Sequence, residues 1–230
     1  MRKVVAIISA FIFTIALTSC ESNNQDTKKE RSISVESALT EALEDYRDCT
    51  LKESWYALFP DAYVDKVIMS RYGDYSDKKR NEIVEVKKIQ LDRKLTEEEC
   101  KAIEKAYGAI LACEDFQNAH PQDEYSSYHE FEQAFLEAGK NTDPIFTVEE
   151  GYYIKCLCYR DGLDESEDPS SANSGEMRTE KYYAFRTTEE GWVFDSIDTF
   201  PNSSVCVWYA FMFPELVPDS MSVRSRISEF

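Results

Sequence analysis

The spacing of apolar residues changes part-way along the chain, and this change restricts the fold class more than any other feature. In the first half, apolar side chains recur every three or four positions, which places them on one face of a helix. After Gly139 they alternate with polar residues over residues 144–162, 176–188 and 191–200, as in antiparallel strands. This order predicts an α+β domain in which N-terminal helices pack on one face of a curved, mostly antiparallel sheet.

Capping residues indicate where two of the helices begin. Thr50 and Glu53 fit a capping box, in which a hydroxyl and a carboxylate bond the first unpaired N–H groups of a helix. Thr96 and Glu99 form a second capping box, ahead of a long apolar stripe. Together with the apolar spacing, these signals predict helices over residues 35–46, 51–59, 61–72, 95–111 and 127–138.

Glycines and turn residues complete the predicted order of elements. Gly73 and Gly139 are expected to end two of the helices, because glycine readily adopts the left-handed conformation that follows many helices. Residues 82–91 are rich in β-branched side chains and predict a strand. Residues 188–191 predict a hairpin turn, and the acidic, serine-rich link over residues 161–175 predicts a mobile loop.

The C-terminal residues carry weaker signals. Residues 205–213, VCVWYAFMF, are apolar enough to form a buried strand and too few to cross a membrane as a helix. Prolines then stop this run, and residues 220–230 are expected to fray. We therefore expect a main domain over residues 35–200 and a C-terminal extension over residues 201–230.

The N-terminus has the pattern of a signal peptide. Arg2 and Lys3 precede an apolar run over residues 4–17. A membrane-spanning helix needs about 20 predominantly apolar residues, and this run is shorter. We therefore expect cleavage rather than retention of this segment.

Residues 17–20, Leu-Thr-Ser-Cys, resemble the lipobox of bacterial lipoproteins. In that family a diacylglycerol is attached to the cysteine sulfur, the signal peptide is cleaved just before it, and the new N-terminus is often acylated. The resemblance implies removal of residues 1–19, lipidation at Cys20 and a protein anchored to the extracytoplasmic face of the cell membrane. The polar residues 20–34 then form a flexible tether. An ordinary secretory signal with a chance cysteine is the alternative.

The charge of the mature chain restricts its partners. Without residues 1–19 it carries 24 basic and 44 acidic side chains, and thus a formal charge of −20. Nucleic acid is therefore not an expected partner, because its phosphates would be repelled. The same charge opposes contact with anionic lipid, so the membrane is expected as a partner only through lipidated Cys20.

Six cysteines remain beside Cys20, enough for three disulfides. Cys156 and Cys158 lie two positions apart in an expected strand, so they point to the same face and cannot readily bond each other. No C-x-x-C motif and no nearby histidine support a zinc or redox site. Free buried thiols are therefore favoured slightly.

Two short motifs and the order of elements resemble the NTF2-like cone, particularly the group found in secreted bacterial lipoproteins. The motifs are residues 58–64, LFPDAYV, and the pair Gly191 and Trp192 in the closing strand. The resemblance covers roughly residues 35–200 and implies a hollow between helices and sheet that can hold a ligand or an active site. The C-terminal extension departs from that family.

Catalytic and metal-binding signals are weak in this sequence. His120 and His129 stand in polar surroundings and are expected to be solvated. The acidic residues 161–168 offer oxygen ligands for calcium, but they lack the spacing and central glycine of an EF-hand. We expect no metal and no cofactor, and no nucleophile is paired with a base in a recognisable motif.

The strands after Gly139 are rich in aromatic residues, half of which should face the core. The other half offer a binding surface, with Tyr153, Tyr159, Tyr183 and Trp192 as candidate binding residues. Two functions remain open. The first is a non-catalytic, lipid-anchored binding module for a small molecule, a peptide or an envelope protein. The second is a cone-fold enzyme with a carboxylate and tyrosine site in its hollow.

Overall fold

The computed structural model describes residues 33–44, 49–79, 82–140, 142–162, 175–197 and 204–222, which belong to one compact unit. Cys20, the signal peptide and nearly all of the expected tether lie outside these residues. Most of the acidic link after residue 162 does so too. Within the described part of the chain, no helix is both long enough and apolar enough to cross a membrane.

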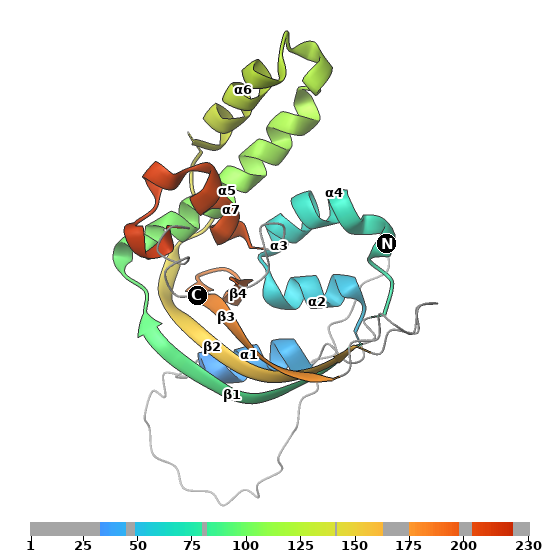
Figure 1. Ribbon diagram of the computed structural model, residues 1–230, viewed down its shortest axis with the longest axis vertical. Helices are drawn as coiled ribbons and strands as arrows, with labels where there is room; N and C mark the ends of the chain where they lie inside the picture. Colours follow the sequence, from blue (N-terminus) through green and yellow to red (C-terminus); the bar gives the residue numbers. More distant parts are fainter. Residues whose placement is uncertain are drawn as a thin grey trace, which may run out of the picture. The chain divides into compact units, whose positions relative to one another are not determined.

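Four strands of the described chain form one antiparallel sheet in sequence order. They are β1 (Glu82–Lys94), β2 (Val148–Gly162), β3 (Glu176–Thr187) and β4 (Gly191–Ser196). The pairing of β1 with β2 shifts register after Val86 and again after Leu91, and such bulges bend strands. Both strands follow a long curve in Figure 1. The expected α+β class with a curved antiparallel sheet is confirmed.

Helical elements precede, separate and follow the strands. Before the sheet come α1 (Val35–Glu44), α2 (Leu51–Leu58), α3 (Asp61–Tyr63), the π-helical turn η2 (Val64–Ile68), α4 (Met69–Tyr72) and the 3-10 turn η3 (Gly73–Tyr75). Between β1 and β2 lie α5 (Glu97–Ala119), the 3-10 turn η4 (Gln122–Glu124) and α6 (Tyr128–Lys140). After the sheet come α7 (Val205–Met212) and the 3-10 turns η5 (Pro214–Leu216) and η6 (Asp219–Met221).

Both expected capping boxes are present. The hydroxyl of Thr50 accepts from the N–H of Glu53 at 3.2 Å, and the Glu53 carboxylate accepts from the N–H of Thr50 at 2.7 Å. Thr96 and Glu99 exchange the same two bonds at 3.2 and 2.8 Å. The second of these helices, α5, begins at Glu97 rather than at residue 95, and it continues to Ala119.

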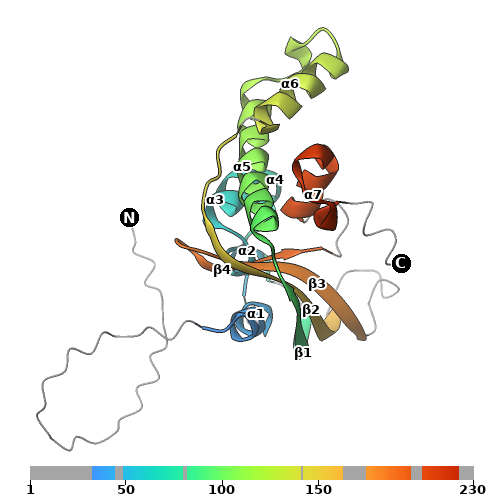
Figure 2. The same ribbon diagram turned by 90° about the vertical axis from the view of Figure 1, so that its left-hand side faces the viewer.

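The sheet is covered on both faces, so the expectation of helices on one face alone is wrong. On one face, Leu39 and Leu43 of α1 join Ile154 in an apolar core. On the other, Tyr107 of α5 joins Phe185 in a second core, to which the π-helical turn and α7 also contribute. Figure 2 shows α1 below the sheet and α5 with α7 above it. Because β3 carries consecutive apolar residues, both of its faces need a cover.

Helix α7 stands where a buried strand was expected over residues 205–213, and that expectation is wrong. The hydroxyl of Ser204 accepts from the N–H of Val207 at 3.1 Å, and the Asp195 carboxylate accepts from the N–H of Cys206 at 2.8 Å. A helix bonds its own backbone within the apolar interior, whereas a strand would need a free sheet edge there. Met221, beyond α7, is fully buried, so fraying is also wrong for the described residues near the end.

The glycines with an expected role lie at or within one residue of the expected element ends. Gly73 follows the end of α4 at Tyr72, as expected, but its φ of −55° is not left-handed and the chain continues into a 3-10 turn. Gly139 lies within α6, which ends at Lys140. The expected hairpin turn after β3 is confirmed, and Gly191 at its end has a φ of 78°, which glycine adopts without strain.

Candidate functional site

The structure does not bring the four candidate binding residues of the sheet together. Tyr183 is only 1% exposed and belongs to the core, so the expectation of an exposed side chain is wrong there. Tyr153 packs against Tyr183, with the guanidinium of Arg93 over its ring at 5.6 Å. Trp192 packs with the core on the opposite face, and its indole N–H donates to the carbonyl of Ile33 at 3.1 Å.

Tyr159, the fourth candidate, is half-buried on β2, and its hydroxyl donates to the Asp161 carboxylate at 3.4 Å. Asp161 is the one acid of the expected calcium loop that lies within the described residues together with its side chain. Among those residues, no group of three or more His, Cys, Asp or Glu side chains is arranged to hold a metal ion.

The interior between α5 and the sheet is filled by aromatic rings. The ring of Tyr107 lies 5.7 Å from that of Tyr63, 5.3 Å from that of Phe146 and 5.7 Å from that of Phe185. Phe146 and Phe185 stack at 5.7 Å. These side chains fill the space between α5 and the sheet, so this region is core rather than a hollow.

The buried carboxylates near this interior serve structural roles. Glu114 accepts from Arg71 at 2.6 Å, and Asp195 accepts from the first turn of α7. Glu190 is a partly exposed acid that accepts from the N–H of Asp61, where α3 begins. Its pKa is raised by burial and by the nearby charges of Asp61 and Glu189, and lowered in part by that hydrogen bond. None of these groups forms a nucleophile and base pair.

Two cysteines of the sheet confirm one expectation. Cys156 and Cys158 lie on the same face of β2, fully buried in the core between the sheet and α1, and both are free thiols. Cys113 is also a buried free thiol, and burial raises the pKa of its sulfur to about 12. These thiols are therefore packing groups of the apolar cores.

Helices α5 and α6 form an antiparallel hairpin that projects away from the sheet (Figures 1 and 2), and we call α5, η4 and α6 the arm. The middle of α5, residues 106–111, is buried in the core over the sheet, whereas its last turn is exposed. In α6, Gly139 alone among the described residues is fully buried. Phe131, Phe135 and Leu136 of this helix are only half-buried.

Aromatic rings line the inner side of the arm in a continuous row. Phe131 lies 5.8 Å from Phe116, 5.4 Å from Tyr125 and 6.1 Å from Phe135, measured between ring centroids. We call Phe116, Tyr125, Phe131 and Phe135 the aromatic row. Two helices are enough to align these rings, but the rings stay half-exposed because no third helix of the described chain covers them.

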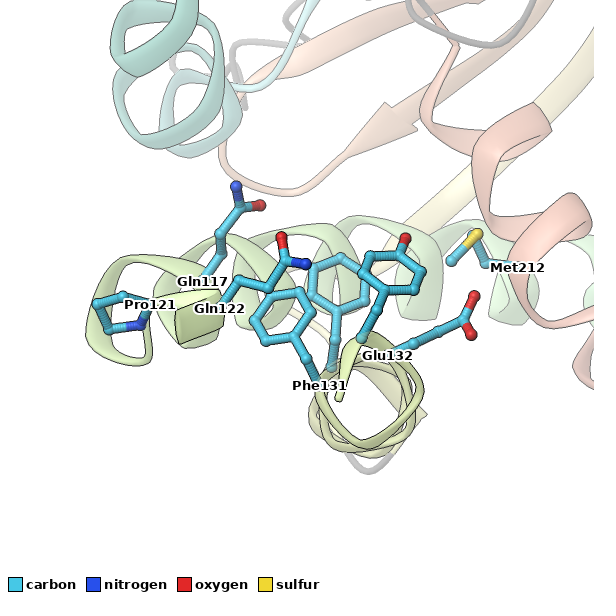
Figure 3. A pocket seen from close by; sticks show the side chains of 8 residues that line it. Gln117, Pro121, Gln122, Phe131, Glu132 and Met212 are labelled. Atoms are coloured by element: carbon cyan, nitrogen blue, oxygen red, sulfur yellow. The ribbon is translucent and has the colours of Figure 1, made fainter. Parts of the chain in front are cut away.

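A groove of about 430 Å³ opens along the aromatic row. We call it the arm groove, and it is lined by Gln117, Pro121, Gln122, Tyr128, Phe131, Glu132, Phe135 and Met212. Figure 3 shows Phe131 in the middle, with Gln117, Pro121 and Gln122 at one end and Glu132 with Met212 at the other. The volume lies within the range of ligand sites in proteins.

Two large apolar side chains on the helices that contribute to the arm groove are exposed to solvent. Tyr128 is 63% exposed on α6, and Phe211 is 67% exposed on α7, next to Met212 of the lining. Phe, Tyr and Met are enriched at protein interfaces, and glutamine amides can bond a peptide backbone. The groove therefore has the chemistry of a recognition site rather than that of a catalytic site.

The two histidines lie on the arm and are exposed to solvent, as expected. His120 packs against Phe116 at 4.9 Å and has its Nδ1 3.9 Å from the carboxylate of Glu124. His129 has its Nδ1 3.8 Å from the carboxylate of Glu132. Neither histidine is held against a nucleophilic side chain in the described contacts.

Comparison with protein-family models, with curated proteins and with solved structures found no match to this chain. Its function is therefore argued from the geometry of its own residues.

Proposed function

We propose that this protein is a lipid-anchored, extracytoplasmic binding module without catalytic activity, and that the arm groove receives an apolar segment of a protein partner. The observation that carries the proposal is the half-exposed aromatic row along a projecting helical arm. Buried apolar surface contributes roughly 25 cal/mol per Å², so a segment that covers these rings gains binding free energy from each of them.

The filled interior supports the choice of a binding module over a cone-fold enzyme. An enzyme of that kind would need a solvent-filled hollow with a poised acid or base. Here Tyr107 and its aromatic neighbours occupy the interior, and Glu114 and Asp195 have structural partners. The order of elements and the curved sheet still support an NTF2-like relationship, which we retain as part of the proposal.

The sequence before residue 35 supports a place at the membrane. Each methylene that enters the bilayer contributes about 0.8 kcal/mol, so the two or three acyl chains expected on Cys20 would hold the domain firmly. The polar tether would then let the arm reach a partner in the envelope without bringing the acidic domain onto anionic lipid.

Photo-crosslinking in living cells tests the groove. A photoreactive phenylalanine analogue at position 128 should form one discrete adduct with a partner protein, and Phe131→Ala should remove that adduct. The matched control is the same analogue at Tyr75, an exposed tyrosine of η3. Identical adducts at both positions, or adducts that persist in Phe131→Ala, would contradict the proposal. A catalytic turnover that a single carboxylate substitution abolishes would do so as well.

A further inference from the structure

The outer part of the arm, residues 112–140, carries a one-sided charge. Between Ala112 and Lys140 there are seven acidic residues and a single basic one. The acidic residues are Glu114, Asp115, Asp123, Glu124, Glu130, Glu132 and Glu137. The basic residue, Lys140, lies 3.2 Å from Glu215, outside the arm. The groove therefore opens in a negative potential that is stronger than the composition of the whole chain requires.

Two cations from the rest of the domain pair with acids of α5. Arg71 pairs with Glu114 at 2.6 Å, and Lys66 pairs with Asp115 at 2.9 Å. Farther along the arm, Glu132 in the groove lining faces His129, which is charged only when protonated. Glu124 and Glu132, toward the open end of the arm, thus lie near His120 and His129 rather than near a Lys or Arg in the described contacts.

We propose that the segment bound in the arm groove is a cationic amphipathic helix of a partner protein. This inference rests on the proposed function of the groove. The apolar face of the segment would lie on Phe131 and Phe135, and its Lys or Arg side chains would face Glu132 and the acids beside it. Two antiparallel helices with an exposed groove between them offer a binding site for a third helix, as in other helix-in-groove complexes.

Charge and shape together select this occupant. A groove on an acidic arm repels the phosphates of nucleic acid and of anionic lipid, and the arm attracts Lys and Arg over a distance of about 10 Å at moderate salt. A small polar molecule would leave the aromatic row exposed, whereas an amphipathic helix covers it and matches the charge. Such complementarity affects both the rate and the specificity of association.

Three fluorescein-labelled helical peptides of about four turns test the proposal. They share the same Leu and Phe positions, and their polar positions are all Lys, all Gln or all Glu. Fluorescence anisotropy measures their binding to the mature chain in a non-ionic detergent. We expect the Lys peptide to bind at least about tenfold more tightly than the Gln peptide at low salt. We expect this ratio to shrink at about 0.5 M salt, because screening weakens the charge pairs.

Variants of the groove separate specific binding from general attraction to an acidic protein. Tyr128→Ala and Phe131→Ala should each weaken the Lys and Gln peptides alike; Tyr128 is so exposed that its loss leaves folding intact. Glu132→Gln should weaken only the Lys peptide, by about twofold to fivefold. The matched control is Glu41→Gln, an exposed acid on α1 across the sheet, which should leave all three affinities unchanged.

The outcomes distinguish the inference from the proposed function. The Gln or Glu peptide could bind as tightly as the Lys peptide, with Phe131→Ala still weakening that binding. This result would refute the cationic partner and leave the proposed binding role of the groove supported. If no peptide binds, the groove itself is wrong as a helix-binding site. Lys-peptide binding that Tyr128→Ala and Phe131→Ala leave unchanged would show diffuse attraction and overturn the inference. Self-association in ultracentrifugation that Tyr128→Ala abolishes would instead assign the groove to a second copy.

Discussion

Glu99 is fully buried and yet ionised, because hydrogen bonds from three elements converge on its carboxylate. Arg93 of β1 donates at 2.7 and 2.6 Å, the N–H of Thr96 donates at 2.8 Å, and the hydroxyl of Ser220 in η6 donates at 2.7 Å. Burial raises the pKa of Glu99, but these bonds outweigh it and bring the pKa down to about 2. One residue therefore ties the start of α5 to the sheet and to the C-terminal segment.

This lowered pKa predicts how stability depends on pH. The ordinary pKa is 4.5, so the contribution of Glu99 is fully present above that value and is lost as pH falls from 4.5 toward about 2. At pH 7, Glu99→Gln should lower the free energy of unfolding by roughly 2 to 3 kcal/mol. Denaturant titrations of both proteins at several pH values should show this difference narrowing below pH 4.5. A difference that stays constant down to pH 3 would contradict the assignment.

At the scale of the element, the packing of α6 depends on the absence of a side chain at Gly139. A Cβ atom there would lie 2.7 Å from the sulfur of Cys113 in α5 and 2.9 Å from the ring of Phe213. Both distances are too short for ordinary contact, so the glycine lets α6 approach α5 and the end of α7 closely. The arm is thus fixed at its base by this contact and by the pair between Lys140 and Glu215.

We expect Gly139→Ala to destabilise the protein by about 1 to 3 kcal/mol and to loosen the seat of α6. Gly73→Ala is the matched control, because its φ of −55° suits alanine and its Cβ would meet Met69 at an ordinary 3.7 Å. Thermal unfolding and hydrogen exchange of the arm measure the two effects. Equal thermal unfolding midpoints for Gly139→Ala and the unmodified protein would contradict this prediction, because they would show that α6 can shift without loss of stability.

At the scale of the whole molecule, the strong negative charge and the lipobox resemblance act together in the proposal. A chain with 24 basic and 44 acidic residues after cleavage gains little from contact with an anionic membrane. Covalent lipid would therefore have to supply the attachment, while the tether separates the arm from the bilayer. The position of the domain and its acidic recognition surface are then compatible.

We expect Cys20 to carry the lipid. Cells fed a clickable palmitate should label the unmodified protein, whereas Cys20→Ala should remain unlabelled and lose its attachment to the membrane fraction. Cys49→Ala, a change at another cysteine, controls for unspecific thiol labelling. Equal labelling of the unmodified protein and Cys20→Ala would refute the lipobox interpretation.

Local signals in the sequence determined the elements whose causes are themselves local. The capping boxes at Thr50 and Thr96 start α2 and α5 through bonds to residues three positions ahead, and these need no distant partner. The alternation after Gly139 likewise fixed the antiparallel strands and put Cys156 and Cys158 on one face, because side chains in a strand alternate. The fold class followed from these elements.

The sequence predicted the apolar residues of the candidate site but not their exposure. The apolar side of one helix was recognisable from Phe131, Phe135 and Leu136. An apolar stripe of this kind usually packs into the protein core. Its exposure depends on how far α5 extends beyond the sheet. Pro121 marks the end of α5 at Ala119, because proline cannot continue a helix, but no local signal shows where α5 leaves the sheet. The tyrosines of the strands gave the opposite error. Tyr183 was a candidate for an exposed binding surface, but it is buried in the core that the sheet shares with α5.

Only the tertiary structure decided the features that depend on what lies opposite a segment. Residues 205–212 are apolar enough for strand or helix, and they form a helix because Asp195 and Ser204 cap them in an interior that offers no sheet edge. A glycine occupies position 139 within α6 because Cys113 and Phe213 leave no room for a side chain there. Sequence alone sets which side chains seek burial, whereas the partner that buries them, or leaves them open on the arm, is set by contacts between distant residues.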